Sequence, residues 1–222
     1  MVYSPSEENY IKAIYHLKGD SKTVSTNELA DELETSPASV TDMLKKLKTK
    51  KLLHYEKYQG FKLSPEGRKL AINVVRRHRL WEFFLAEKLK FEWEEVHEVA
   101  EELEHVSSKK LIDKLDEYLG FPRFDPHGDP IPDIQGRIQN TSQVSLSELP
   151  VNTLAEVSSV GNQSTDMLEL LKHRNILIGT KLEVKKKFGF DNSLEIKIRN
   201  LLSFTISDQV AQNIFVKYDS KA

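Results

Sequence analysis

The order of patterned segments in the first third of the chain constrains the fold more than any other feature. Apolar residues recur at helical spacing over residues 5–17, over the short segment 25–33, and again over 37–50. Pro37 suits the first position of the third helix, where its missing N–H is not needed. Residues 53–63 then alternate around a glycine-containing turn, which predicts a β-hairpin. Helix, short helix, tight break, helix and hairpin is the order of a winged helix-turn-helix.

The third predicted helix carries the residues expected to contact DNA. In a helix-turn-helix the second helix of the motif lies in the major groove, and its first turn reaches the base edges. Small and hydroxyl side chains there can approach bases, while lysines suit phosphates. The predicted contacts are Ser36, Pro37, Ala38, Ser39, Thr41, Lys45, Lys46 and Lys48. A scaffold or protein-binding role for the three helices remains an alternative, but the lysine run favours DNA, because neutralised phosphates release counterions.

The rest of the chain changes character twice. Residues 66–119 carry helical patterns throughout, and the proline-rich stretch after them predicts a linker. Short apolar runs in the last part of the chain predict a small β-rich barrel with one helix at about 165–172. The predicted fold is mainly α with α+β parts. Its domains are a winged helix-turn-helix over 1–65, a helical domain over 66–122, a linker over 123–147 and a β-rich domain over 148–222.

Histidines and glutamates gather at helical spacing in the predicted helical domain. Two imidazoles and two carboxylates fall within an arc of about 100° if their segment is one helix, and a second His–Glu pair is one turn apart on the preceding helix. The first group is His97, Glu101, Glu104 and His105, and the second is His78 and Glu82. So many carboxylates in one seam are unfavourable unless a cation compensates them. Imidazole with hard oxygen ligands suits Mn²⁺ or Fe²⁺, so the pattern predicts a divalent-metal site for one of these ions.

Composition narrows the class of protein. Hydrophobic residues make up 39% of the chain and charged residues 30%, which is ordinary for globular proteins, and no apolar run is long enough for a transmembrane helix. The N-terminal segment is unlike a signal peptide, and the chain has no cysteine. We therefore expect a cytoplasmic protein without membrane association. The formal net charge is only −2, but basic and acidic stretches are separate, which indicates two kinds of partner.

Six stretches of the sequence are specific in combination, namely Glu8-Asn9-Tyr10-Ile11, Ser39-Val40-Thr41, Leu63-Ser64-Pro65-Glu66-Gly67, His78-Arg79-Leu80-Trp81-Glu82, the segment from His97 to His105, and Gly128-Asp129-Pro130-Ile131-Pro132. Taken together, they resemble the diphtheria toxin repressor family of iron- and manganese-dependent regulators. The resemblance covers the whole chain. It implies a helical dimerisation domain, an SH3-like C-terminal domain, and a homodimeric repressor of metal homeostasis that binds a palindromic operator when it holds metal.

The resemblance also implies two metal sites. The first would use Asn9 of the first helix with Glu101, Glu104 and His105, and the second would use His78, Glu82 and His97. In members with the SH3-like domain, that domain adds two ligands to the second site, which align with Gln163 and Asp166 here. Metal bridging the first helix and the dimer domain would fix the two winged helices at the spacing that the operator requires.

Three positions depart from the family pattern. Glu101 stands where iron-responding members have cysteine, as in the manganese-responding ones. Asn9 stands where the family usually has Asp or Met, and its amide oxygen can coordinate although it is neutral. Lys12 replaces a carboxylate of manganese regulators that lack the third domain, which disfavours their closely spaced two-metal cluster.

Two other functions stay open from the sequence. A metallohydrolase could use Glu101 or Glu104 as a base beside a metal-bound water. The sequence offers no nucleophile motif or phosphate-binding loop beside these residues, and a hydrolase would leave the helix-turn-helix unexplained, so we expect no enzyme and no catalytic residues. A winged-helix regulator that senses a non-metal ligand would leave the acidic helix merely solvated.

Overall fold

The chain divides into two compact units. The computed structural model describes residues 3–18, 23–56, 60–106, 108–139, 142–199 and 201–218. The first unit consists of Met1–His78, Glu101–Leu115 and Pro132–Ile138, and the second of Arg79–Ala100, Asp116–Ile131 and Gln139–Ala222. Because the chain passes between the units several times, three helices begin in one unit and end in the other.

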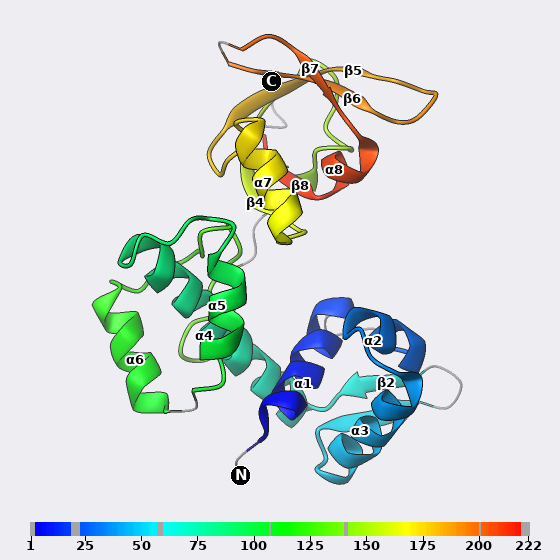
Figure 1. Cartoon of the computed structure of the whole chain (residues 1–222), viewed down its shortest axis with the longest axis vertical. Helices are drawn as coiled ribbons and strands as arrows, with labels where there is room; N and C mark the ends of the chain where they lie inside the picture. The colour runs from blue at the N-terminus through cyan, green and yellow to red at the C-terminus, as the bar shows by residue number, and fades with distance from the viewer. Residues whose placement is uncertain are drawn as a thin grey trace. The chain divides into compact units, whose positions relative to one another are not determined.

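The first unit contains the winged helix-turn-helix (Figure 1). Its elements are α1 (Pro5–Lys18), α2 (Thr26–Glu32), α3 (Pro37–Thr49), β1 (Leu53–Glu56) and β2 (Gly60–Leu63). Ser25 and Glu28 form a capping box at the start of α2, and Ser36 caps α3 directly before Pro37. The helices bury their apolar sides in a shared core, which includes Ile11, Leu29, Val40, Leu44 and Leu47. The predicted fold of this part is confirmed.

The wing is joined to the helices through Val24. Strands β1 and β2 are antiparallel, and Phe61 exchanges two backbone hydrogen bonds with Val24, at 2.8 and 3.0 Å. Gly60 has a φ of 115°, and a Cβ there would clash with the Val24 carbonyl oxygen, so the position requires glycine. Gln59, part of the predicted hairpin turn, lies outside the described residues.

Three helices occupy the stretch predicted to be helical, with breaks that affect the metal ligands. They are α4 (Pro65–Glu87), α5 (Val96–Leu103) and α6 (Lys109–Tyr118). Because α5 ends at Leu103, Glu104 and His105 lie in a turn after the helix. The single-helix arc that grouped these two residues with His97 and Glu101 is therefore wrong. No helix in the described part of the chain is long and apolar enough to span a membrane.

The second unit contains the β-rich domain, a six-stranded antiparallel sheet in the described residues (Figure 1). In spatial order its strands are β3 (Val144–Ser145), β8 (Ile214–Lys217), β4 (Leu154–Val160), β5 (Lys181–Lys187), β6 (Leu194–Ile198) and β7 (Phe204–Ile206). The helices α7 (Thr165–His173) and α8 (Asp208–Gln212) connect β4 to β5 and β7 to β8. Alternate strand residues and the inner side of α7 fill one core. Strand β7 begins only at Phe204, and the apolar residues Leu201 and Leu202 before it are exposed.

Part of the predicted linker, residues 123–147, packs against strand β4. The Asp125 carboxylate accepts hydrogen bonds from the backbone N–H groups of His127 and Asp129, at 2.9 and 3.0 Å. The His127 carbonyl accepts the Val160 N–H at 3.1 Å. Gly128 has a φ of 87°, and a Cβ there would clash with the carbonyl oxygen of Ser158. This turn therefore has a fixed backbone, which buries the His127 side chain completely.

Candidate metal centres and DNA-binding surface

The first candidate centre, centre 1, lies in the first unit and joins α1 to the end of α5. It consists of Glu8, Lys12, His78, Glu101, Glu104 and His105. Glu104 is fully buried, and its carboxylate lies 2.7 Å from His78 Nδ1 and 2.8 Å from Lys12 Nζ. Lys12 Nζ also lies 3.2 Å from the Glu101 carboxylate. Three predicted ligands, Glu101, Glu104 and His105, are therefore brought to one place.

Glu8 belongs to the same centre. Its carboxylate is 2.8 Å from His105 Nδ1 and forms an ion pair of 2.8 Å with Arg77. His105 Nε2 in turn lies 3.8 Å from the Glu104 carboxylate. The imidazole of His105 thus stands between a carboxylate of α1 and a carboxylate that follows α5.

The electrostatics of centre 1 favour the charged form of Glu104. Burial alone would raise the pKa of Glu104, but the hydrogen bond with His78 and the ammonium of Lys12 outweigh it, so the pKa lies below its ordinary value. A buried carboxylate that stays ionised is the form that coordinates a divalent cation.

The residue of α1 that contacts His105 in this centre is Glu8, and the role of Asn9 as the α1 ligand stays a prediction. Asn9 is exposed, whereas Glu8 is buried and contacts His105. Neighbouring residues on a helix point about 100° apart, while residues four apart share a face. Glu8 therefore shares a face with Lys12 and is buried on it, whereas Asn9, three residues before Lys12, is exposed. The Glu8–Lys12 spacing was a signal in the sequence that could have identified Glu8.

A second candidate centre, centre 2, lies wholly in the second unit and consists of Glu82, His97, Asp125 and His127. Glu82, Asp125 and His127 are buried, and each can offer a ligand atom within 4.8 Å of the other two. His97 Nδ1 lies 3.2 Å from the Glu82 carboxylate, and His127 Nδ1 lies 3.6 Å from it. Of these residues, Asp125 and His127 had not been predicted, because their proline- and glycine-rich segment has the composition of a linker.

The buried histidine of centre 2, His127, has the tautomer and the charge of a metal ligand. His127 Nε2 lies 3.0 Å from the Trp93 carbonyl oxygen, which can only accept, so this nitrogen carries the proton. Nδ1 then presents a lone pair toward Glu82. Burial lowers the pKa of His127 against the opposing effect of the Glu82 charge, which keeps the imidazole neutral. A neutral imidazole held through its other nitrogen by a backbone carbonyl is a usual metal ligand in proteins.

Centre 2 has more acceptors than its protein partners satisfy. Asp125 Oδ2 and His127 Nδ1 are buried and have no hydrogen-bond partner within the described residues. Burial, together with the charges of Glu82 and Asp129, raises the pKa of Asp125 well above its ordinary value. Arg79 lies 3.4 Å from Asp125 and 3.1 Å from Asp129 and compensates part of the charge. A divalent cation fits the remaining donors by charge and ligand type.

The other residues predicted for the second site are placed as follows. Gln163 donates a hydrogen bond to Asp129 at 3.1 Å, beside centre 2, while Asp166 is exposed in the first turn of α7. His78 is hydrogen-bonded to Glu104 in the first unit. Two statements about the second site stay predictions. The first is that His78, Glu82 and His97 share one metal ion, and the second is that Gln163 and Asp166 are ligands.

The start of α3 presents the predicted DNA contacts at the surface. All eight are exposed, namely Ser36, Pro37, Ala38, Ser39, Thr41, Lys45, Lys46 and Lys48. Some of their polar groups already have partners: the hydroxyls of Ser36 and Ser39 are 2.9 Å apart, and Thr41 donates to the Pro37 carbonyl at 2.8 Å. Lys46 and the neighbouring Lys50 both form ion pairs with Glu7 of α1.

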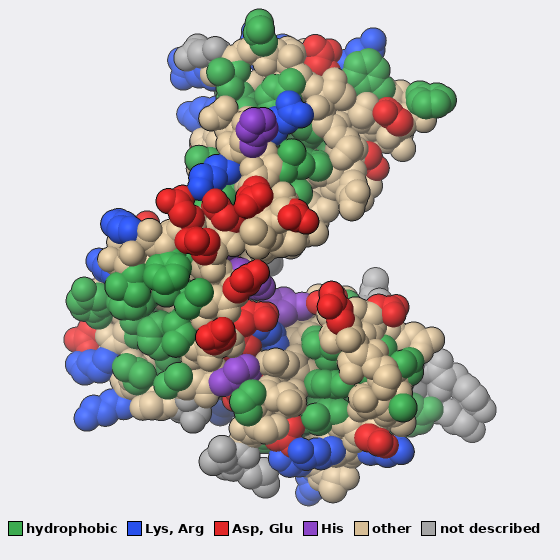
Figure 2. Space-filling view, viewed as in Figure 1, with side chains coloured by type: hydrophobic (Ala, Val, Ile, Leu, Met, Phe, Trp, Pro, Cys, Tyr) green, Lys and Arg blue, Asp and Glu red, His purple; other side chains and the backbone are tan. Residues whose placement is uncertain are grey.

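An apolar face is exposed on the helical part of the second unit. The exposed fraction is 67% for Phe121, 65% for Tyr118 and 54% for Leu89, and Phe91 is also exposed. Figure 2 shows hydrophobic side chains gathered over the helical part of the molecule. Contiguous apolar patches on soluble proteins usually mark interaction surfaces.

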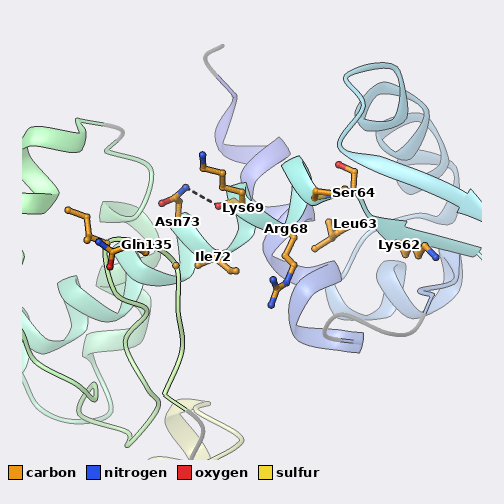
Figure 3. A pocket seen from close by; sticks show the side chains of 11 residues that line it. Lys62, Leu63, Ser64, Arg68, Lys69, Ile72, Asn73 and Gln135 are labelled. Atoms are coloured by element: carbon orange, nitrogen blue, oxygen red, sulfur yellow. Dashed lines mark hydrogen bonds between the residues drawn. The ribbon is translucent and has the colours of Figure 1, made fainter.

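The first unit also has a cavity of about 510 Å³ beside the wing (Figure 3). Lys62 of β2, Arg68 and Lys69 of α4, and Gln135 contribute to its lining. The described residues that line it include no histidine and no carboxylate, so this cavity lacks metal ligands and is separate in character from centre 1.

Comparisons with known proteins agree with this architecture. Residues 3–61 match the iron dependent repressor N-terminal DNA binding domain, residues 64–133 match the iron dependent repressor metal binding and dimerisation domain, and residues 144–218 match the FeoA domain. The chain is 34% identical over 143 residues to the HTH-type transcriptional regulator MntR of Bacillus pumilus, covering 64% of this chain and 99% of that protein. It is 27% identical over 193 residues to the diphtheria toxin repressor of Corynebacterium glutamicum, covering 82% of this chain and 84% of that protein.

A solved structure described as a manganese-dependent transcriptional repressor complex with manganese superimposes with a TM-score of 0.88 at 30% identity, covering 96% of this chain and 99% of that one. These matches confirm the predicted fold and the predicted function, a metal-dependent repressor that binds a DNA operator as a homodimer. The chain therefore belongs to the diphtheria toxin repressor family of iron- and manganese-dependent transcriptional regulators.

Proposed function

We propose that Mn²⁺, with Fe²⁺ as the alternative, activates this repressor by binding at centre 1 and centre 2. The observation that carries the proposal is the donor chemistry. Both centres offer only carboxylate oxygens and imidazole nitrogens, and buried acceptors of Asp125 and His127 lack hydrogen bonds to the described residues. Such donors suit Mn²⁺ and Fe²⁺ better than soft metals.

At centre 1 the proposed ligands are Glu101, Glu104 and His105 with one residue of α1. The metal supplies a divalent charge that several carboxylates can share. Glu8 and Lys12 bring α1 to this place, and Glu7, the residue before Glu8, contacts the lysines of α3. Ordering α1 against the turn after α5 therefore also orders the helix that contacts DNA.

Because the protein is a dimer, the fixed position of α3 in each subunit affects DNA binding. Two winged helices must meet two half-sites at one spacing, so a fixed position of each reading helix favours the operator. We propose that the apolar face around Phe121 and Tyr118 is the dimer surface. Metal shifts the equilibrium only as far as it binds the DNA-competent form more tightly, typically by about 1–3 kcal/mol per site.

The first test addresses centre 1. Glu104→Gln keeps the shape of the buried side chain but removes its charge, and Glu102→Gln changes an exposed neighbour. We expect Glu104→Gln to abolish Mn²⁺-dependent operator binding in a gel-shift titration, and Glu102→Gln to retain it. Equal Mn²⁺ stimulation in both variants, with both folded by circular dichroism, would contradict the role of centre 1.

The second test addresses centre 2. His127→Gln removes the proposed imidazole ligand, and His173→Gln, at an exposed histidine of α7, is the matched control. Calorimetric titration with Mn²⁺ should give one ion fewer per chain for His127→Gln than for the control. An unchanged stoichiometry would remove His127 from the metal ligands.

The same protein preparations and Mn²⁺ assays distinguish the proposed function from its rivals. We propose that the protein acts in the cytoplasm, without catalytic residues, and with the domain limits given by the sequence. A regulator of a non-metal ligand would show no stoichiometric Mn²⁺ binding, and a metallohydrolase would hydrolyse generic esters or phosphates with Mn²⁺. Binding to an operator library with Mn²⁺, Fe²⁺, Zn²⁺ or no metal would identify the activating ion.

A further inference from the structure

We propose that Lys12 is a built-in cation of centre 1, whose ammonium holds Glu101 and Glu104 together in the metal-free protein and must leave when a divalent ion binds there. This inference rests on the proposed metal binding at centre 1. It concerns a residue that sets the metal affinity without being a ligand.

The ammonium group of Lys12 lies between two proposed metal ligands, Glu101 and Glu104. Its Nζ lies 2.8 Å from the Glu104 carboxylate and 3.2 Å from the Glu101 carboxylate. Its side chain is only 13% exposed, and that of Glu104 is fully buried. The ammonium therefore occupies carboxylate lone pairs that a divalent ion would need.

Two cations offset most of the charge of the three carboxylates in centre 1 without metal. Arg77 pairs with Glu8 on one side, and Lys12 pairs with Glu101 and Glu104 on the other. Burying carboxylates this closely is unfavourable unless a cation compensates them. Lys12 thus assembles the ligands before the metal arrives, and it repels a second cation brought to the same oxygens.

An ordinary surface salt bridge would behave differently. Exposed pairs contribute little, and removing one has no bearing on a nearby ligand site. Lys12 instead connects α1 to the turn after α5 at the two carboxylates proposed to hold the metal. Its removal must therefore affect the metal-free and the metal-bound protein in opposite directions.

The test compares Lys12→Met, which keeps the length of the side chain without its charge, with Lys12→Arg, which keeps the charge. Lys69→Met, at an exposed lysine of α4, is the control. Two quantities are measured on the full chain: the unfolding temperature after removal of metal by a chelator, and the Mn²⁺ dissociation constant by calorimetry.

We expect Lys12→Met to unfold at a lower temperature than wild type without metal, yet to bind Mn²⁺ about tenfold or more tightly, within the usual range of coupling between two sites. Lys12→Arg should keep an unfolding temperature and a Mn²⁺ affinity close to those of wild type. Lys69→Met should change neither quantity. Mn²⁺ affinity of Lys12→Met that is equal to or weaker than that of wild type would overturn the inference.

A second measurement keeps the inference testable if Lys12→Met does not fold. In a crystal structure of the wild-type protein with Mn²⁺ at centre 1, Lys12 Nζ should have moved out of hydrogen-bonding distance of Glu104. An ammonium still at its present place beside a bound ion would refute displacement. Absence of Mn²⁺ binding by the wild-type protein would instead contradict the proposed function itself.

Discussion

Glu7 connects α1 to the helix that contacts DNA, and replacing it with glutamine isolates that connection. Its carboxylate is 1% exposed and lies 2.6 Å from Lys50 Nζ and 3.1 Å from Lys46 Nζ. Burial acts to raise the pKa of Glu7, but hydrogen bonds from Lys50, the Ser4 backbone and Lys46 lower it from 4.5 to about 2. The folded protein therefore strongly prefers the charged carboxylate.

The magnitude follows from this pKa and from the exposure of the partners. A fall from 4.5 to about 2 corresponds to roughly 3 kcal/mol in favour of the folded state at neutral pH. Lys50 and Lys46 are 30% and 54% exposed, so solvent screens both pairs. We therefore expect Glu7→Gln to lower the free energy of unfolding by about 1–2 kcal/mol at pH 7. As a control, Asp42→Asn removes an exposed pair with Lys45 and should cost about 0.5 kcal/mol or less.

The pH dependence of the stability difference between wild type and Glu7→Gln tests whether the ion pairs of Glu7 cause it. Because the folded-state pKa is below the unfolded value, the stabilisation is fully present above about pH 4.5 and is lost as the pH falls toward 2. Urea unfolding of wild type and Glu7→Gln at pH 7, 4 and 3 should show the difference shrinking as the pH falls. A difference that is constant over this range would refute the ion-pair explanation. A variant as stable as wild type at pH 7 would refute the connection between the two helices.

The remaining predictions concern the α1 ligand and the dimer surface. Glu8→Gln should weaken Mn²⁺ binding by calorimetry, whereas Asn9→Ala, at an exposed position, should leave it close to wild type; the reverse order would restore Asn9 as the ligand. Phe121→Glu places a charge on the exposed apolar face and should shift the dimer toward monomer in analytical ultracentrifugation. If Phe121→Glu leaves the dimer intact, the dimer surface lies elsewhere.

Local patterns were enough to predict the winged helix-turn-helix, but not the whole fold. The helix-turn-helix followed from apolar spacing, Pro37 and the alternating wing, and these features depend on neighbours in the sequence. The sheet was predicted only in part, because β3 and β8 are short strands whose pairing partners are remote along the chain. Residues 123–131 illustrate the limit most clearly: proline and glycine suggest a linker, yet Gly128 permits a tight approach to Ser158 that fixes the turn.

The ligand types of centre 1 were predictable, but their geometry was not. Glu101, Glu104 and His105 are close in the sequence, so they lie near one another even though the helix predicted to carry all three ends at Leu103. The α1 residue depends on how that helix is rotated in the folded unit, and the resemblance placed Asn9 there where the structure has Glu8. Centre 2 needed contacts remote in sequence, because Asp125 and His127 reach Glu82 only through a folded turn.

The rotation of α1 also explains how metal and DNA can be coupled in this protein. Glu8 and Lys12 are four residues apart and share the face toward centre 1, while Glu7 is turned about 100° from Glu8 and meets the lysines of α3. A rigid helix cannot move one of these contacts without moving the other. Any change that metal imposes at Glu8 or Lys12 therefore reaches Lys46, a predicted phosphate contact, through Glu7.

The ion pairs of Glu7 limit the free energy that couples metal binding to operator binding. Partly exposed ion pairs contribute about 1 kcal/mol or less each, so the path through Glu7 accounts for the lower part of the typical range of about 1–3 kcal/mol. Glu7→Gln should accordingly reduce the Mn²⁺ stimulation of operator binding without abolishing it, unlike Glu104→Gln. Freed from Glu7, Lys46 and Lys50 would also bind phosphates more strongly without metal. The repressor would then bind DNA more tightly in the absence of metal, and it would respond to metal less.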